Sequence, residues 1–167
     1  TALALGAVTA GPASAGGILL YEVGTEDVGL AAAGYAARAS DASTVLTNPA
    51  GMTRLEGQQV LVGTQLLHSN LKFSPSSGTS SALGSENGGH AAGFNGSFPG
   101  GGLFYTYSVS KDLKLGFAAT GNFGAALKYD DDWVGRYYVR STALVGMSML
   151  PSIAYRVTDN LSLGASA

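Results

Sequence analysis

The side chains that most often carry out chemistry are few in this sequence and far apart. His68 and His90 are the only histidines, and there is no cysteine. A serine hydrolase needs a histidine beside a serine nucleophile and a carboxylate, but no Gly-x-Ser-x-Gly signature occurs. Without cysteine, the chain also lacks disulfides, thiolate nucleophiles and thiolate metal ligands. We therefore interpret both histidines as solvated residues at or inside loops, and we expect no enzymatic activity.

The acidic run Asp130–Asp132 is the strongest candidate for a metal site. Carboxylate oxygens bind Ca²⁺, but a dedicated calcium loop alternates its ligands along the chain, and this run does not. We interpret it as an acidic, solvated external loop, and we expect neither a metal nor a cofactor.

Two further sets of side chains could meet a ligand. Four arginines could pair with a ligand carboxylate in a lumen or with acids of the protein itself, and the sequence leaves both open: Arg38, Arg54, Arg140 and Arg156. Three aromatics could contact an apolar ligand, although we favour a girdle at a membrane interface: Trp133, Tyr137 and Tyr138.

The composition favours a membrane protein that crosses the bilayer with strands. The 167 residues are 46% hydrophobic and only 12% charged, with 25 glycines, whereas soluble domains carry about 25% charged residues. No run of roughly 18 to 20 apolar residues could form a spanning helix. The net charge of −2 argues against a nucleic-acid partner.

Period-two alternation predicts an all-β fold, an antiparallel transmembrane β-barrel of which about five strands are present. The predicted strands are residues 59–66, 103–109, 113–120, 143–157 and 161–165. Residues 107–118 repeat as residues 155–166, each copy a strand, a tight polar turn and a strand. Because bacterial barrels have at least 8 strands, we expect a piece of a longer barrel. A secreted soluble β-domain that binds an apolar ligand is an alternative.

The segments outside the strands have other signatures. Residues 1–15 end in Ala13-Ser14-Ala15, which predicts a signal-peptide remnant. Residues 28–39 are rich in alanine and favour a helix, and residues 74–102 have loop composition. Asn48-Pro49-Ala50-Gly51 predicts a turn before the first strand.

Motifs spread in order over residues 16–167 resemble those of the FadL/TodX family of outer-membrane transporters. The motifs are Gly16-Gly17-Ile18, Asp41–Thr44, Asn48–Gly51, Gly121–Gly124, Asp132–Tyr137, Pro151–Arg156 and Leu161–Gly164. The resemblance implies a fourteen-stranded barrel in the bacterial outer membrane, plugged by an N-terminal hatch. We expect the hatch, with a short helix, at residues 16–55 and the first barrel strands at residues 56–167.

The resemblance also implies a function and its residues. The hatch motif would be Asn48, Pro49, Ala50 and Gly51, and a kink in the third strand, Gly121, Asn122, Phe123 and Gly124, would open the wall laterally. From the residues alone, Gly121–Gly124 could equally be a strand end. We expect passive transport of long-chain fatty acids or aromatic hydrocarbons by a monomer that contacts outer-membrane lipids and lipopolysaccharide. A structural or adhesive barrel without transport is the other alternative.

Overall fold

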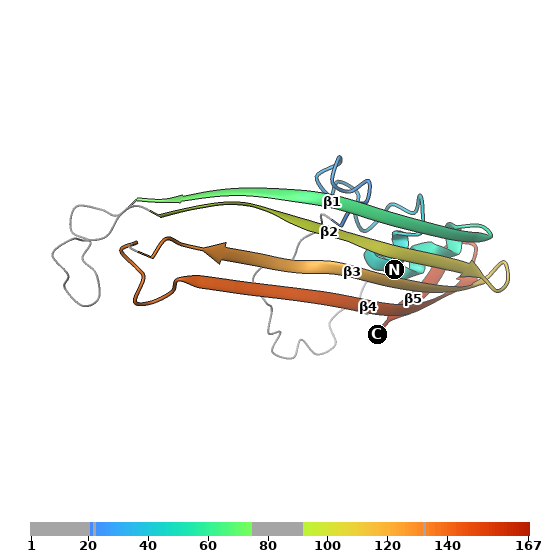
Figure 1. Cartoon of the computed structure of the whole chain (residues 1–167). Coiled ribbons are helices and arrows are strands. Elements are labelled where there is room, and N and C mark those ends of the chain that lie inside the picture. The colour runs from blue at the N-terminus through green and yellow to red at the C-terminus, as the bar shows by residue number, and fades with distance from the viewer. Residues whose placement is uncertain (1–20, 22, 75–91, 132) are drawn as a thin grey trace, which may run out of the picture.

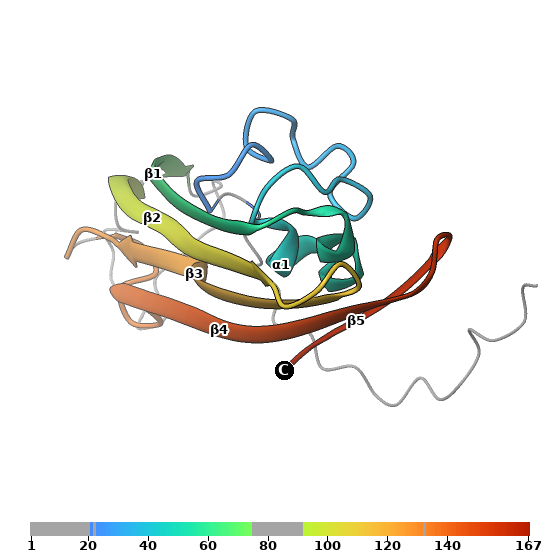
Figure 2. The ribbon, with the colours of Figure 1, turned by 90° about the vertical axis from the view of Figure 1, so that its right-hand side faces the viewer.

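A computed structural model describes residues 21, 23–74, 92–131 and 133–167. Five strands form one antiparallel sheet, and each strand pairs with the next along the chain (Figure 1). Their bounds are Gln58–Phe73 (β1), Ala92–Ser108 (β2), Leu113–Lys128 (β3), Ser141–Thr158 (β4) and Leu161–Ser166 (β5). The sheet is curved but not closed, with β1 and β5 at its edges (Figure 2). The predicted antiparallel sheet of about five strands is confirmed.

The two faces of the sheet differ because side chains alternate along each strand. One cross-strand row on the outer face consists of Val62, Leu103, Ala119 and Met149. The neighbouring row on the inner face consists of Leu61, Phe104, Ala118 and Leu150. Phe104 and Ala118 are fully buried, whereas Val62 and Met149 are 67% and 68% exposed. The outer face is therefore an apolar surface that the described chain leaves uncovered.

The tight turns predicted in the repeat are present, both at one end of the sheet. Residues 109–112 join β2 to β3, and residues 159–160 join β4 to β5. Ser110 Oγ accepts the amide protons of Asp112 and Leu113 at 3.2 and 3.0 Å, which closes the first turn. At the opposite end, β1 ends at Phe73, β2 begins at Ala92, β3 ends at Lys128 and β4 begins at Ser141.

Three strands are clearly longer than the sequence predicted, since β1 continues to Phe73 and the other two are β2 and β3. β2 begins at Ala92, so the predicted loop over residues 74–102 is wrong for its last part, and β3 continues to Lys128. The register of β2 with β1 is unbroken from Ala92 to Tyr107. Backbone hydrogen bonds between strands do not require apolar and polar side chains to alternate. Glycine-rich residues can therefore form a strand without the period-two pattern by which strands were predicted.

The predicted helix over residues 28–39 is wrong. Residues 26–37 form a succession of turns, with positive φ at Ala31, Ala32 and Gly34. These positive φ values break the helical backbone, and the segment closes on itself through an ion pair between Asp27 and Arg38. In a helix, residues 11 positions apart would be separated by roughly 16 Å, so this contact is incompatible with a continuous helix despite the alanine content.

The helical residues of the N-terminal segment (residues 23–55) lie further along the chain. They are α1 (Thr44–Thr47) and the 3₁₀-helix η1 (Pro49–Arg54). Neither these helices nor any other helix of the described residues is long and apolar enough to cross a membrane. The predicted signal remnant, residues 1–15, lies outside the described residues.

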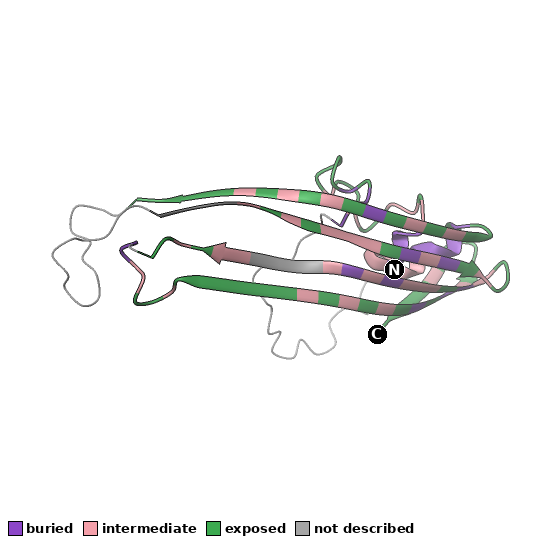
Figure 3. Ribbon diagram, in the orientation of Figure 1, coloured by how far each residue is buried: buried purple, intermediate pink, exposed green. Residues whose placement is uncertain are grey.

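The N-terminal segment packs against the inner face of the sheet and forms the core (Figures 2 and 3). The buried residues that it contributes are Val23, Ala42, Val45 and Met52. The strands contribute Phe104, Ala118 and Ala154. Burial of a side chain such as Met52 or Val45 contributes about 1.5–3 kcal/mol, so the segment is held chiefly by apolar contact with β2, β3 and β4.

A second, smaller cluster lies in the connection between β3 and β4. Trp133 is 8% exposed, stacks on Tyr129 at 4.2 Å between ring centroids, and donates from Nε1 to Val139 O at 2.8 Å. The expectation that Trp133 belongs to an interfacial girdle is therefore wrong, because its ring is enclosed by its own loop and by Phe73 of β1, which packs edge-on at 5.8 Å between ring centroids. Tyr137 and Tyr138 are exposed.

Candidate functional site

The NPAG turn (Asn48–Gly51) joins the two short helices. Asn48 ends α1, donating from its backbone N–H to Thr44 O at 2.9 Å and from Nδ2 to Ala36 O at 2.8 Å. Pro49 begins η1, a position where its fixed φ fits and no N–H is needed. The Gly51 N–H donates to Asn48 O at 2.8 Å and completes the turn.

Two glycines on the inner face let the N-terminal segment approach the sheet closely. A Cβ on Gly164 in β5 would lie 2.2 Å from Ala50 N, and a Cβ on Gly116 in β3 would lie 2.5 Å from Met52 Sδ. These glycines occupy equivalent positions in the repeat of residues 107–118 and 155–166. Sequence reasoning found the repeat but missed what its glycines contact.

Polar contacts hold the end of the segment to β4 and β5. Thr53 Oγ1 lies 2.8 Å from Ser162 Oγ and donates to Ala50 O at 3.0 Å. The guanidinium of Arg156 donates to the Thr53 carbonyl. The NPAG turn and the residues after it therefore contact strands more than 100 positions later in the chain through backbone, hydroxyl and guanidinium groups.

The start of the segment is attached to β1. Gly24 N donates to Gln65 Oε1 at 3.1 Å. A Cβ on Gly63 would lie 2.3 Å from Gly24 O, so the two main chains touch. The segment thus spans the inner face from β1 to β5.

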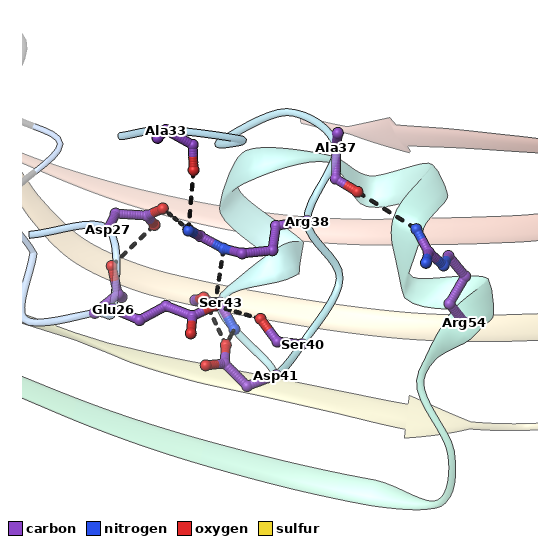
Figure 4. Close-up of polar contacts among 10 residues, drawn as sticks. Glu26, Asp27, Ala33, Ala37, Arg38, Ser40, Asp41, Ser43 and Arg54 are labelled. Carbon is purple, nitrogen blue, oxygen red and sulfur yellow. Dashed lines mark hydrogen bonds and ion pairs between the residues drawn. The ribbon is translucent and has the colours of Figure 1, made fainter. Parts of the chain in front are cut away.

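Arg38 lies at the centre of a polar cluster within the segment (Figure 4). Its Nε pairs with Glu26 Oε1 at 2.8 Å, and Nη2 pairs with Asp27, which is 1% exposed. Nη1 donates to Ala33 O at 3.2 Å, and Thr25 Oγ1 donates to Asp27 Oδ2 at 3.0 Å. Close by in sequence, partial burial raises the pKa of the Tyr35 phenol. The cluster folds residues 25–40 into a closed loop.

The other arginines that sequence reasoning singled out have different partners. Arg140 pairs with Asp131 in the β3–β4 connection. Arg54 Nη1 donates to Ala37 O at 3.4 Å. The sequence left open whether these arginines pair with a ligand carboxylate or with acids of the protein. Arg38 and Arg140 pair with acids of the protein, whereas Arg54 and Arg156 donate to backbone carbonyls.

β2 and β3 separate part-way along their length (Figure 1). They pair from Ser108 and Lys114 up to Gly102 and Thr120, and no further pairing between them occurs in the described residues. Beyond this point β2 stays paired with β1, and β3 stays paired with β4.

The separation coincides with an irregularity in β3. Its register with β4 shifts between Thr120 and Phe123, where residues 121 and 122 face the single residue Met147. This arrangement is a β-bulge, which bends a strand. Gly121–Gly124 therefore lie inside β3, and the alternative of an ordinary strand end is excluded.

The described residues show no group of His, Asp or Glu side chains arranged to hold a metal ion. His68 lies within β1, so the expectation of a loop position is wrong, and its Nδ1 is 3.1 Å from Ser97 Oγ. Asp132 and His90 lie outside the described residues. Two features of the described residues therefore stand out as functional candidates. One is the N-terminal segment docked on the inner face of the sheet, and the other is the pairing of β2 with β3 that stops part-way.

A model of the family of outer membrane protein transport proteins (OMPP1/FadL/TodX) matches residues 6–167. The chain belongs to this family. The resemblance seen in the sequence motifs is confirmed.

Similar proteins include outer membrane protein P1 of Haemophilus influenzae strain Rd, 35% identical over 94% of this chain and 36% of that protein. The 47 kDa outer membrane protein of Pasteurella multocida is 34% identical over 85% of this chain and 31% of that protein. The chain thus spans about a third of the length of these relatives. The family and its relatives place this member in the outer membrane.

The fold is that of a solved outer-membrane barrel. A crystal structure of a Pseudomonas aeruginosa FadL homologue matches 90% of this chain and 37% of its own, with a TM-score of 0.64 and 24% identity. The apolar outer face of the family member described here agrees with that fold, because lipid-facing residues alternate with interior ones in such barrels.

Proposed function

We propose that the complete protein carries hydrophobic compounds, such as long-chain fatty acids or aromatic hydrocarbons, passively across the outer membrane and releases them sideways into the bilayer. The observation that carries this proposal is the separation of β2 from β3 beyond Gly102 and Thr120, next to the bulge at Gly121. Neighbouring strands in a membrane normally pair along their length, because an unpaired backbone group in lipid costs several kcal/mol.

Lateral release has a physical rationale. Removal of an acyl chain from water is favourable by about 0.8 kcal/mol for each CH₂. An exit through the barrel wall into the bilayer keeps the chain out of water. Pro99 supports such an opening, since proline in a sheet is confined to edges and bulges. It lies in the part of β2 that has no partner on the β3 side.

The N-terminal segment serves as a hatch in this proposal. It lies over the inner face from β1 to β5, with the NPAG turn against Gly164, and passage requires part of it to move. No step of this mechanism needs a nucleophile, a cofactor or ATP, and the protein works as a monomer. An adhesive barrel would have no use for an interrupted wall, so the β2–β3 separation supports transport over that alternative.

The test replaces Gly121 with valine in the complete protein. No atom lies within 4 Å of a Cβ at this position, so the side chain fits the fold, and we expect it to obstruct the opening. Uptake of radiolabelled fatty acid by cells should fall at least severalfold. Ala119→Val is the matched control, because Ala119 is paired on both sides, with Leu103 and Met149. Normal uptake by a correctly inserted G121V protein would contradict lateral release.

A further inference from the structure

A cationic pocket lies at the short-turn end of the sheet, where the N-terminal segment meets the β2–β3 turn. Its volume is about 350 Å³, which is within the range of about 300–1,000 Å³ found for small-molecule sites. Four cationic side chains line it: Arg54, Lys111, Lys114 and Arg156. Glu56 is the one acidic residue of the lining. This excess of positive charge favours an anionic occupant.

Lys114 is the most unusual of these cations. It lies on the inner face of β3, is only 5% exposed, and donates from Nζ to Ser108 Oγ at 2.7 Å. An ammonium group has three donors, and in the part of the chain that the structure describes Lys114 forms no ion pair with a carboxylate. Burial of an ammonium costs several kcal/mol unless it is paired. An anion in the pocket would remove this cost.

The neighbouring groups leave room for such an anion. Arg156 donates to the Thr53 carbonyl from one nitrogen of its guanidinium, which has five donors in all. Lys111 is exposed, with Nζ 3.8 Å from Asp112 Oδ2. Leu55, which is 5% exposed, adds apolar surface to the lining. The pocket therefore combines a fixed buried cation and a guanidinium, and Leu55 is the apolar side chain of its lining.

We propose that this pocket binds the carboxylate head group of an amphiphilic ligand, with Lys114 as its central cation. The volume exceeds what a single ion needs, since one water occupies roughly 30 Å³, and the Leu55 side chain suits the first methylenes of a chain. The assignment rests on the proposed transport of hydrophobic compounds, and it gives the head group of the fatty-acid ligands a binding residue on β3.

The test measures the binding of dodecanoate and of uncharged dodecanol to the complete protein in lipid nanodiscs by calorimetry. We expect Lys114→Gln to weaken dodecanoate binding by about tenfold or more, as for loss of a charge-assisted hydrogen bond, and to leave dodecanol binding unchanged. Lys114→Arg should retain most of the affinity. Lys128→Gln is the matched control, because Lys128 is an exposed lysine of the same strand, roughly 46 Å away at about 3.3 Å per residue.

Four other outcomes would contradict the head-group site, and they differ in what they imply for the transport proposal. Unchanged dodecanoate binding by K114Q, with normal binding of both compounds by the wild type, refutes the head-group site but leaves the transport proposal intact. Equal weakening of both compounds by K114Q shows that the substitution damaged the pocket rather than removed a charge contact. If the wild type binds neither compound, the transport proposal itself fails. Displacement of dodecanoate by inorganic phosphate would show that the pocket takes free anions instead.

Discussion

At the scale of single residues, Gly116 and Gly164 determine how closely the N-terminal segment approaches the sheet. Their neighbours differ in kind. Gly164 faces the backbone of Pro49 and Ala50, whereas Gly116 faces the ends of the Met52 and Val45 side chains. A backbone in a packed turn cannot move aside, but a methionine can change rotamer. The same repeated glycine therefore has a different tolerance in each copy.

We expect Gly164→Ala to weaken the docking of the NPAG turn more than Gly116→Ala does. Overpacking of a closed contact costs about 1–3 kcal/mol, and the new Cβ would lie 2.2 Å from Ala50 N. Limited proteolysis of the N-terminal segment measures the docking, since cleavage follows the population of the open form. Gly121→Ala is the control, and faster cleavage of G116A than of G164A would contradict the ranking.

Arg38→Met should open the loop of residues 25–40. The substitution leaves Asp27, which is 1% exposed, without its ion-pair partner. Removal of one member of a buried pair costs about 3–5 kcal/mol, so protease cleavage within residues 28–37 should rise steeply. The double variant D27N/R38M should recover part of the protection, because the unpaired charge is gone. Equal protection of R38M and the wild type would show that the pair does not hold the loop.

Residue identities predicted some contacts and not others. Arg38 near Glu26 and Asp27 was foreseeable as a pairing with the protein's own acids. The burial of Trp133 was not foreseeable, because it depends on contacts with Tyr129, Val139 and, far away in the sequence, Phe73. His68 was placed at a loop because the strand signal weakens after Leu66, although pairing with β2 carries β1 on to Phe73.

At the scale of elements, the helix propensity of individual residues did not predict where the helices of the N-terminal segment lie. Alanine favours a helix at residues 28–39, but helix propensities amount to only a few tenths of a kcal/mol per residue, and the observed turns, with a left-handed residue at Gly34 and the Asp27–Arg38 contact, override them. The helices lie instead at Thr44–Thr47 and Pro49–Arg54, where packing of Val45 and Met52 stabilises them. Tertiary contact, which the sequence does not display, decides the outcome.

The separation of β2 from β3 left a partial trace in the sequence. Pro99 and the neighbouring glycines were interpreted as a loop because they oppose strand formation in the interior of a sheet. At a strand side without a partner these residues are tolerated. The proline and glycines therefore indicated a strand side without a partner, but this interpretation was possible only once the pairing of β2 with β1 and β3 was known.

A disulfide between η1 and β5 should form readily and leave uptake unchanged. The chain has no cysteine, and Thr53 Oγ1 lies 2.8 Å from Ser162 Oγ, so T53C/S162C brings two sulfurs close to bonding distance, about 2.05 Å. Residues 44–55 are packed against four strands, β2 to β5, and we expect the mobile part of the hatch to be the loop of residues 25–40. Loss of fatty-acid uptake on oxidation, restored by reductant, would show that η1 itself must detach.

At the scale of the whole molecule, the alternation of apolar outer and mixed inner residues predicts how the protein tolerates charge. Met149 is 68% exposed at the middle of β4, and Thr158 is exposed at its end. Arginine on the lipid face costs about 2–4 kcal/mol at the midplane and about 0–1 kcal/mol near the interface. Met149→Arg should therefore reduce the folded fraction in lipid vesicles, measured by heat-dependent gel mobility, while Thr158→Arg should not. Equal folding of both variants would argue against a lipid-facing outer surface.

The fold class, the strand order and the direction of most side chains could be predicted from the sequence, because a period of two specifies both the strand and its buried face. The position of the core could not. It lies between the sheet and a segment whose own sequence shows no amphipathic period, and Val23, Ala42 and Met52 become core residues only through contact with strands far away in the chain.

The path of the N-terminal segment across all five strands has a consequence for biogenesis. Val45 and Met52 are buried against Gly116 and its neighbours, and Ala50 touches Gly164, so the curved sheet is assembled around material that is synthesised before it. We therefore expect assembly of the sheet and docking of the N-terminal segment to be coupled, so that a variant that releases the segment folds into lipid vesicles more slowly than the wild type, as heat-dependent gel mobility over time would show.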